Sequence, residues 1–232
     1  MADRLELLVE PSWRSAHAGA QVGLLALRGV VLDAAVSQRF AERRESLEAE
    51  LRQRLAGKSR AELLAELPRL QAYATYYRRF KKTYHVLLQL ESVALKGRSI
   101  GGGPPLVTAG FMAELQSQLL TATHDLDTLR QPLRLCAAAG DERYTALNGE
   151  ELQAKPGDML MADAGGPICT VIAGQSRASS VQADTRRALF VVYAPAGIAT
   201  DAIQRHLDEI EALVRLLAPA VQREGRRLIR AQ

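Results

Sequence analysis

The sequence is poor in cysteine and in long apolar runs, and each shortage excludes a class of protein. Two cysteines, Cys136 and Cys169, occur among 232 residues, too few for a disulfide framework or, alone, for a metal cluster. Both lie in apolar, strand-like segments, where a free cysteine behaves as a small hydrophobic residue. We therefore expect structural thiols in a reducing compartment.

No apolar run approaches the ~18–20 residues that span a bilayer. The longest, residues 22–32, is interrupted by Arg28, and the N-terminal residues form no convincing signal peptide. We therefore expect a cytoplasmic protein with no membrane partner. With 47% hydrophobic and 24% charged residues, the chain can build a packed core. Because no linker composition interrupts it, we expect a single domain over residues 1–232, and the oligomeric state stays open.

Positive charge is what the sequence does have, in two clusters. The net charge is +4, but residues 69–98 carry seven cations against Glu91 alone, an excess of +6. The second cluster, in residues 223–230, has four arginines against Glu224. Such patches attract phosphate backbones, although solvated helix faces or a basic tail give the same pattern. The first cluster supplies six candidate RNA-binding residues: Arg78, Arg79, Lys81, Lys82, Lys96 and Arg98.

Apolar periodicity predicts a helical first half and a β-rich second half. Helices are expected over residues 35–55, 59–67, 70–80, 86–95, 107–120 and 200–218. Strands are expected over 5–9, 22–32, 133–137, 143–146, 158–162, 168–173 and 189–193. Residues 12–21 look irregular, Ser59 and Glu62 have the spacing of a capping box, and the glycines and prolines of 101–105 predict a loop. This order indicates an α+β fold rather than alternating βαβ units.

Aromatic residues interleave with the first basic cluster. They are Tyr73, Tyr76, Tyr77 and Phe80. Aromatics beside cations can stack bases while the cations hold phosphates. The same spacing also suits one helix face packed on the core, with the charges opposite. Both interpretations leave the basic face open to a partner.

The four histidines lack the paired spacing of a zinc site, and no metal or cofactor is expected. His85 and His206 lie in expected helices, where we place them at the surface or the boundary. His124 opens the segment His124-Asp125-Leu126-Asp127, expected as a turn after the helix 107–120. Two carboxylates two residues apart suit acid–base or metal chemistry, but Asp125 could equally cap the turn that follows.

Several short segments follow one another in a recognisable order. They are Leu106-Val-Thr-Ala-Gly-Phe111, His124-Asp-Leu-Asp127, Pro132-Leu-Arg-Leu135, Ala139-Gly-Asp-Glu142, Leu147-Asn-Gly149, Pro156-Gly-Asp158, Ala183-Asp-Thr-Arg186 and Ala188-Leu-Phe-Val-Val192, with Tyr77-Arg-Arg-Phe80 and Leu95-Lys-Gly-Arg98 upstream. This order resembles the B-three/B-four (B3/4) domain of the phenylalanyl-tRNA synthetase beta subunit, especially its free-standing bacterial relatives. The resemblance covers about residues 24–194, with a C-terminal helix at about 200–218. It implies a three-layer α+β domain with the helical N-terminal half packed on a compact β-rich half.

In that family the domain holds a pocket that hydrolyses tyrosine mischarged onto the phenylalanine tRNA. The resemblance therefore implies a tRNA acceptor end as partner and, if the pocket is active, an aminoacyl-tRNA ester hydrolase. The residues carried over to the pocket are Thr108, Phe111, Ala122, His124, Asp125, Ser176, Arg177 and Ser179. The synthetase pattern has aspartate and asparagine in the helix, a histidine at position 122 and a substrate-contacting glutamate at position 177. What matches the pattern near His124 is Asp125, Leu126 and Asp127, together with the framework glycines and strands.

The substitutions weaken the editing chemistry more than the scaffold. Ala122 cannot orient water or accept a proton, and Arg177 would repel an α-ammonium group. Arg177 instead suits a carboxylate or phosphate, with nearby serines as an anion-binding rim. The leading interpretation is a tRNA- or RNA-binding module that need not hydrolyse anything, and no catalytic residue is assigned. The alternatives are a trans-editing hydrolase with a changed pocket, or a binding protein for a small amino-acid-like or anionic molecule.

Overall fold

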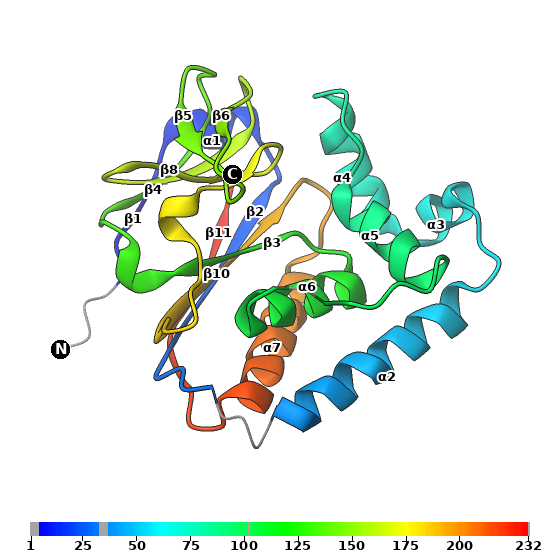
Figure 1. The fold of residues 1–232 in the computed structure, drawn as a ribbon. Helices are drawn as coiled ribbons and strands as arrows, with labels where there is room; N and C mark the ends of the chain where they lie inside the picture. Colours follow the sequence, from blue (N-terminus) through cyan, green and yellow to red (C-terminus); the bar gives the residue numbers. More distant parts are fainter. Residues whose placement is uncertain (1–4, 33–36, 102, 232) are drawn as a thin grey trace.

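The computed structural model describes residues 5–32, 37–101 and 103–231 (Figure 1). Within these residues the chain forms seven α-helices, two 3₁₀ turns and eleven strands. The strands gather on one side of the molecule and helices α2 to α5 on the other (Figure 1). One hydrophobic cluster of buried side chains draws on both parts. The α+β class expected from the sequence is confirmed.

A four-stranded antiparallel sheet forms the middle of the fold. Its order is β11-β2-β10-β3, with β11 (Gln222–Arg230), β2 (Gln21–Arg28), β10 (Arg187–Ala194) and β3 (Thr121–Asp125). The two central strands are buried almost throughout because both faces of the sheet are covered. Helix α7 (Thr200–Leu217) packs directly on β2. At Gly23 a Cβ would lie 2.7 Å from Ile203 Cγ2, so glycine permits this close approach.

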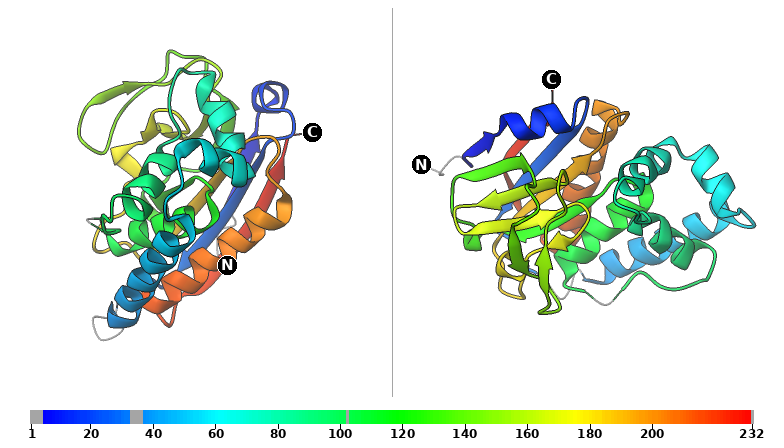
Figure 2. Two further views of the ribbon diagram at one scale, coloured as in Figure 1. Left: turned by 90° about the vertical axis from the view of Figure 1, so that its right-hand side faces the viewer. Right: turned by 90° about the horizontal axis from the view of Figure 1, so that it is seen from above.

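A five-stranded sheet covers the other face of the first one. Its order is β1-β4-β7-β8-β9, with β1 (Leu7–Val9), β4 (Leu133–Ala137), β7 (Met159–Asp163), β8 (Gly166–Thr170) and β9 (Gly174–Gln175). A hairpin of β5 (Arg143–Thr145) and β6 (Glu151–Gln153) extends from it. Helix α1 (Pro11–Ala16) contacts β4. The β-rich half is therefore a two-layer stack, and α6 and α7 add the third layer (Figure 2).

The remaining helices continue from this third layer. They are α2 (Ser37–Leu55), α3 (Arg60–Glu66), α4 (Pro68–Arg78), α5 (His85–Ala94) and α6 (Pro105–Ser117). Helix α2 packs against α5, α6 and α7, and α6 packs against α7 and β3. Ser59 and Glu62 form the predicted capping box at the start of α3. The expected helix 35–55 begins at Ser37 here, and residues 35–36 lie outside the described residues.

Three local predictions are wrong. Residues 12–16, part of the stretch expected to be irregular, belong to the short helix α1 around the buried Trp13. The basic C-terminal segment, for which a tail was one of the open interpretations, forms strand β11, paired with β2. The helix expected to reach residue 120 ends at Ser117, because Gln118 takes a left-handed conformation (φ 62°) that cannot continue it. The chain then enters β3 early, so His124 lies in a strand and not in a turn.

Candidate functional site

A cavity of about 340 Å³ lies between α6, β3 and the loop that precedes α6. Its walls come from Gln89, Gly101, Gly103, Val107, Thr108, Gly110, Phe111, Glu114, Thr121, Thr123 and Gln175. Helix α6 approaches β3 closely at Gly110, where a Cβ would lie 3.0 Å from Thr123 Oγ1. Thr108 and Phe111, predicted as pocket residues, both line this cavity.

Glu114 is the carboxyl group of this cavity. It is 5% exposed, and its Oε1 accepts the Thr121 backbone N–H at 2.6 Å. Burial raises the pKa of Glu114 to about 8, since a carboxylate loses its hydration in an apolar interior. At neutral pH the group is mostly a neutral acid, and it can exchange a proton close to that pH.

A chain of hydrogen bonds leads from Glu114 to helix α7. The Thr121 hydroxyl lies 2.6 Å from His206 Nε2, and His206 Nδ1 lies 2.7 Å from Ser117 Oγ. Burial lowers the pKa of His206 to about 3, so the ring is neutral and has a hydroxyl partner at each nitrogen. The expectation of a surface or boundary position for His206 is therefore wrong: the side chain is 1% exposed.

Two glutamine amides complete the polar lining. Gln175 Nε2 donates to the carbonyl oxygens of Thr123 at 2.8 Å and Ser179 at 3.1 Å. The buried Oε1 of Gln89 has no hydrogen-bond partner among the described residues. The residues that line the cavity thus include a neutral acid and a glutamine whose amide oxygen has no partner among the described residues.

Ala122 and His124, two further predicted pocket residues, point away from this cavity. Side chains alternate along a strand, so Thr121 and Thr123 face α6 while Ala122 and His124 face the opposite side. His124 Nδ1 lies 2.9 Å from Ser179 Oγ. Burial lowers the pKa of His124 to about 3, and its Nε2 is buried without a partner in the described part of the chain. His124 and Ser179 therefore join β3 to the segment after β9.

Asp125 caps a 3₁₀ turn, which is one of the two roles that the sequence left open for it. Its Oδ1 accepts the Asp127 N–H at 3.0 Å, and its Oδ2 accepts the Thr185 hydroxyl at 2.6 Å. Ser176 likewise caps the second 3₁₀ turn, Arg177–Ser179, by accepting the Ala178 N–H. These side chains hold loops in place, and none of them lines the cavity.

Arg177 is exposed and lies outside the cavity wall. Its Nη1 comes within 3.8 Å of the Cβ position at Gly149, in the turn between β5 and β6. The residue that reaches the cavity is Gln175, two positions earlier. The serine rim expected around Arg177 does not form either, since Ser176 and Ser179 are buried and hydrogen-bonded within their own turn.

The first basic cluster is exposed and unpaired. Arg78, Arg79, Lys81 and Lys82 follow one another at the end of α4, and Lys96 and Arg98 come just after α5. All six are exposed, and in the described residues none forms an ion pair with a carboxylate. Glu91, the single acidic residue of the stretch, is paired with Arg60 from α3.

Two of the four arginines of the second basic cluster form ion pairs with helix α7. On β11, Arg223 pairs with Glu211 and Arg226 pairs with Asp208, both on α7. Structure therefore separates two clusters that the sequence left equivalent. Six exposed cations lie at the two ends of α5, whereas Arg227 and Arg230 are the exposed cations of the second cluster that have neutral hydrogen-bond partners.

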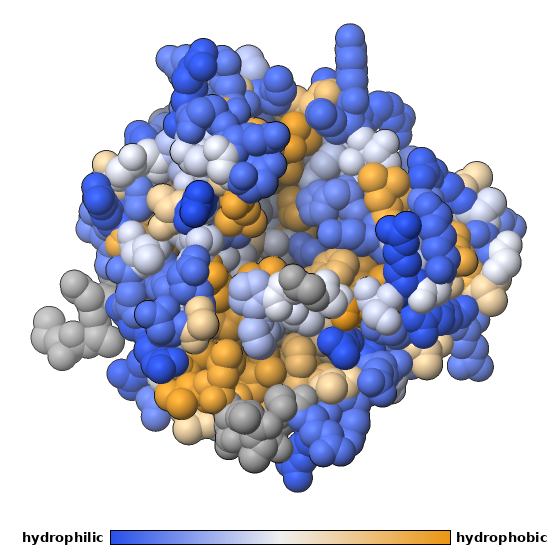
Figure 3. Space-filling model, viewed as in Figure 1, coloured by the Kyte–Doolittle hydropathy of each residue, from blue (hydrophilic) through white to orange (hydrophobic). Residues whose placement is uncertain are grey.

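The tyrosines between the cations belong to the core. Tyr73 donates to the Tyr193 carbonyl at 2.6 Å, and Tyr77 donates to the Val171 carbonyl at 2.9 Å. Tyr76 donates to Asp158 Oδ1 at 2.5 Å. This fits the interpretation of one core-facing helix face, with the charged face left to solvent. Figure 3 shows a hollow between the β-rich part and helices α4 and α5, with polar side chains on its borders.

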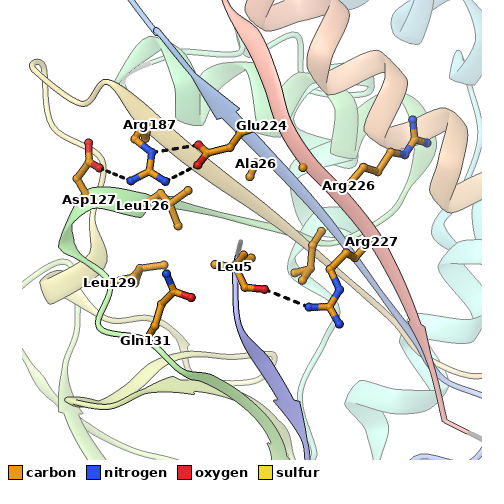
Figure 4. A pocket seen from close by; sticks show the side chains of 12 residues that line it. Leu5, Ala26, Leu126, Asp127, Leu129, Gln131, Arg187, Glu224, Arg226 and Arg227 are labelled. Carbon is orange, nitrogen blue, oxygen red and sulfur yellow. Dashed lines mark hydrogen bonds and ion pairs between the residues drawn. The ribbon is translucent and has the colours of Figure 1, made fainter. Parts of the chain in front are cut away.

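A second cavity, of about 480 Å³, lies where the two sheets separate (Figure 4). Its apolar walls include Leu24, Leu126 and Leu129. At one end Arg187 is held between Asp127, at 2.9 Å, and Glu224, at 3.0 Å. The hydrogen bonds that Arg187 donates to the Glu224 carboxylate are the main cause that raises the pKa of Arg187. Since Arg187 already has two carboxylate partners, we assign this network to joining the sheets.

The described residues offer no site for metal or thiol chemistry. No group of three or more histidine, cysteine or acidic side chains there could hold a metal ion. Cys136 and Cys169 are unpaired and buried. Burial raises the thiol pKa of Cys136 to about 11 and of Cys169 to about 12, so both stay protonated at neutral pH. Of the helices described, none has the length and apolar character to cross a bilayer.

Among proteins of curated function, no sequence matches the chain. A crystal structure of an N-terminal fragment of the phenylalanyl-tRNA synthetase beta-subunit from Pyrococcus horikoshii is similar, with 12% sequence identity and a TM-score of 0.48. The match covers 97% of this chain and 50% of that one, so the chain spans about half the length of that structure. Residues 111–214 match the B3/4 domain family, which confirms the predicted resemblance to the B3/4 domain over this part of the chain.

Proposed function

We propose that the chain binds RNA, with a tRNA acceptor end as the partner that best suits the fold. The six exposed cations at the two ends of α5 carry this proposal. Helix α5 has ten residues, so its ends are about 15 Å apart at ~1.5 Å per residue. That distance is about four base-pair steps along one strand at ~3.4 Å each. The two groups of cations can therefore contact separate phosphates of one backbone.

One end of this surface is close in sequence to the cavity between α6 and β3. Lys96 and Arg98 precede the loop whose Gly101 and Gly103 line the cavity between α6 and β3. A strand held by these cations would bring its end close to Glu114. This closeness in sequence supports a nucleic acid with a reactive or modified end rather than a featureless duplex.

Anisotropy measurements with labelled bulk tRNA at 50 and 200 mM salt test the proposal. If all six cations contact phosphates, affinity should fall on the order of 10²- to 10³-fold between these concentrations. Replacing Lys81 and Lys82 by alanine should lower the slope of log affinity against log salt by about 1.5. The control variant replaces two exposed arginines on other helices, Arg39 on α2 and Arg205 on α7, and should leave the slope unchanged. No binding at 50 mM salt would refute RNA binding.

Ester hydrolysis in the cavity is a second candidate, favoured by Glu114. A carboxyl group with a pKa of about 8 is ionised in a minor fraction of molecules near neutral pH, and this fraction can accept a proton from water. It lies in the same cavity as the hydroxyl of Thr108. Deacylation of a panel of mischarged tRNAs by the wild-type protein and by Glu114→Gln tests this. Deacylation rates equal to those without protein would refute ester hydrolysis and leave the RNA-binding proposal unaffected.

A further inference from the structure

A separate cleft of about 550 Å³ adjoins the first basic cluster. It lies between the turn after α1, one face of α4 and the turn between β10 and α7, and Figure 2 shows these three segments side by side. None of its wall residues belongs to the cavity between α6 and β3. Its size falls in the range of about 300–1,000 Å³ that is typical of small-molecule sites.

The walls of this cleft are made largely of small apolar residues. Ala16, Ala18, Ala72, Ala196 and Gly197 all line it. The two turns approach closely, since a Cβ at Gly19 would lie 3.3 Å from the Cβ of Ala196. Methyl groups and glycine leave room that longer side chains would fill, so the cleft suits a flat apolar group.

His17 gives the cleft a buried polar atom that lacks a partner. The side chain is 5% exposed, and its Nε2 makes no hydrogen bond to any described residue. Burial and the charge of Arg79 lower the pKa of His17 to about 4. At neutral pH the ring therefore offers one N–H and one lone pair, the same groups that line the edge of a nucleobase. Its ring centroid lies 5.9 Å from that of Tyr76.

Arg79 places a cation at the mouth of the cleft. Its guanidinium carbon lies 5.4 Å from the centroid of Tyr76 and 5.6 Å from that of Phe80. The side chain is exposed and, among the described residues, pairs with no carboxylate. A guanidinium held over aromatic rings keeps its N–H donors for a phosphate. Lys81 and Lys82 follow in the next turn of the chain.

We infer that this cleft takes one unpaired nucleotide of the bound RNA, with the base between the small residues beside His17 and its phosphate on Arg79. The inference rests on the proposed RNA binding and adds a requirement for an unstacked base. Double-stranded RNA has no such base to offer, so the cleft distinguishes single-stranded from duplex segments.

Two cleft variants test this without touching the cations. Ala196→Trp fills the cleft from an exposed turn position. His17→Leu removes the unpartnered nitrogen, a change that should preserve folding because no hydrogen bond is lost. Circular dichroism checks the fold of both. Anisotropy with a labelled single-stranded RNA and with a duplex of the same length measures binding, and adenosine and uridine 5′-monophosphates are titrated against the NMR signals of the His17 ring.

Both variants should weaken single-stranded RNA binding by roughly 5- to 150-fold, the range for loss of one stacked base, and leave duplex binding unchanged. Lys81→Ala with Lys82→Ala should weaken both forms. Unchanged single-strand binding in folded cleft variants overturns the cleft proposal while RNA binding stands. If the wild-type protein binds no RNA, the proposed function fails, and the mononucleotide titration decides on the cleft. Saturable changes in the His17 ring signals with either nucleotide would support a nucleotide site there. The absence of such changes would overturn it.

Discussion

Glu114→Gln should make the protein less sensitive to alkaline pH. The folded chain holds this carboxyl group with a pKa of about 8, against an ordinary value of 4.5. Between these values the folded state binds a proton that the unfolded state has released, so stability falls as pH rises. At about 1.4 kcal/mol per pKa unit, this group alone should remove roughly 3 to 4 kcal/mol between pH 5 and pH 8. Glutamine cannot ionise, and its amide oxygen can still accept the Thr121 N–H.

Urea denaturation at pH 5, 6, 7 and 8 measures the effect. The free energy of unfolding of Glu114→Gln, minus that of the wild type, should rise with pH by that amount. Other titrating groups, such as Asp158 with its pKa raised to about 6 by burial, contribute equally to both proteins and cancel. The exposed Glu150→Gln serves as the matched control, and its difference should be flat. Parallel curves for wild type and Glu114→Gln would show that Glu114 ionises normally, and the acid–base role proposed for the cavity would go with it.

Three further changes test the packing that holds the site. Gly23→Ala should lower the free energy of unfolding by ~1–3 kcal/mol, because the added Cβ would meet Ile203 on α7. The control Gly225→Ala, whose Cβ would have nothing within 4 Å, should lower it much less in the same urea denaturation. Tyr76→Phe should cost ~1–3 kcal/mol in thermal unfolding at pH 7, because it removes a hydrogen bond from the buried Asp158; no change would mean that water replaces the hydroxyl. Ser59→Ala removes a helix cap and should lower the free energy of unfolding by ~1 kcal/mol. A loss below about 0.2 kcal/mol would show that α3 does not depend on this cap.

Local sequence signals predicted the elements that local chemistry determines. The capping box of Ser59 and Glu62 is complete within four residues, so it could be read directly. The strand β11 could not, because its polar side chains show no alternation and its pairing partner β2 lies about 200 residues earlier. Two of its arginines, Arg223 and Arg226, pair with carboxylates of α7, which only the tertiary fold brings near.

The sequence pointed to lining residues of the cavity on helix α6 but not to those on strand β3. Thr108 and Phe111 follow from the matching helix, but which face of β3 lies under α6 depends on a register of one residue. The sequence therefore pointed to Ala122 where Thr121 and Thr123 line the wall. One signal for Glu114 was present: it is the single charged residue between Arg98 and Asp125, and a lone acid on an apolar helix usually has a buried partner or a task.

The position of β2 in the central sheet also sets an order of events during synthesis. This strand ends at Arg28, but its partners β10 and β11 begin at Arg187 and Gln222. A ribosome must add about 160 residues before the first partner exists, at roughly 5–20 residues per second. During those ~10–30 seconds a nearly continuous apolar strand waits unpaired, a state that invites wrong pairing. The nascent chain should therefore be most dependent on chaperones until β10 has emerged.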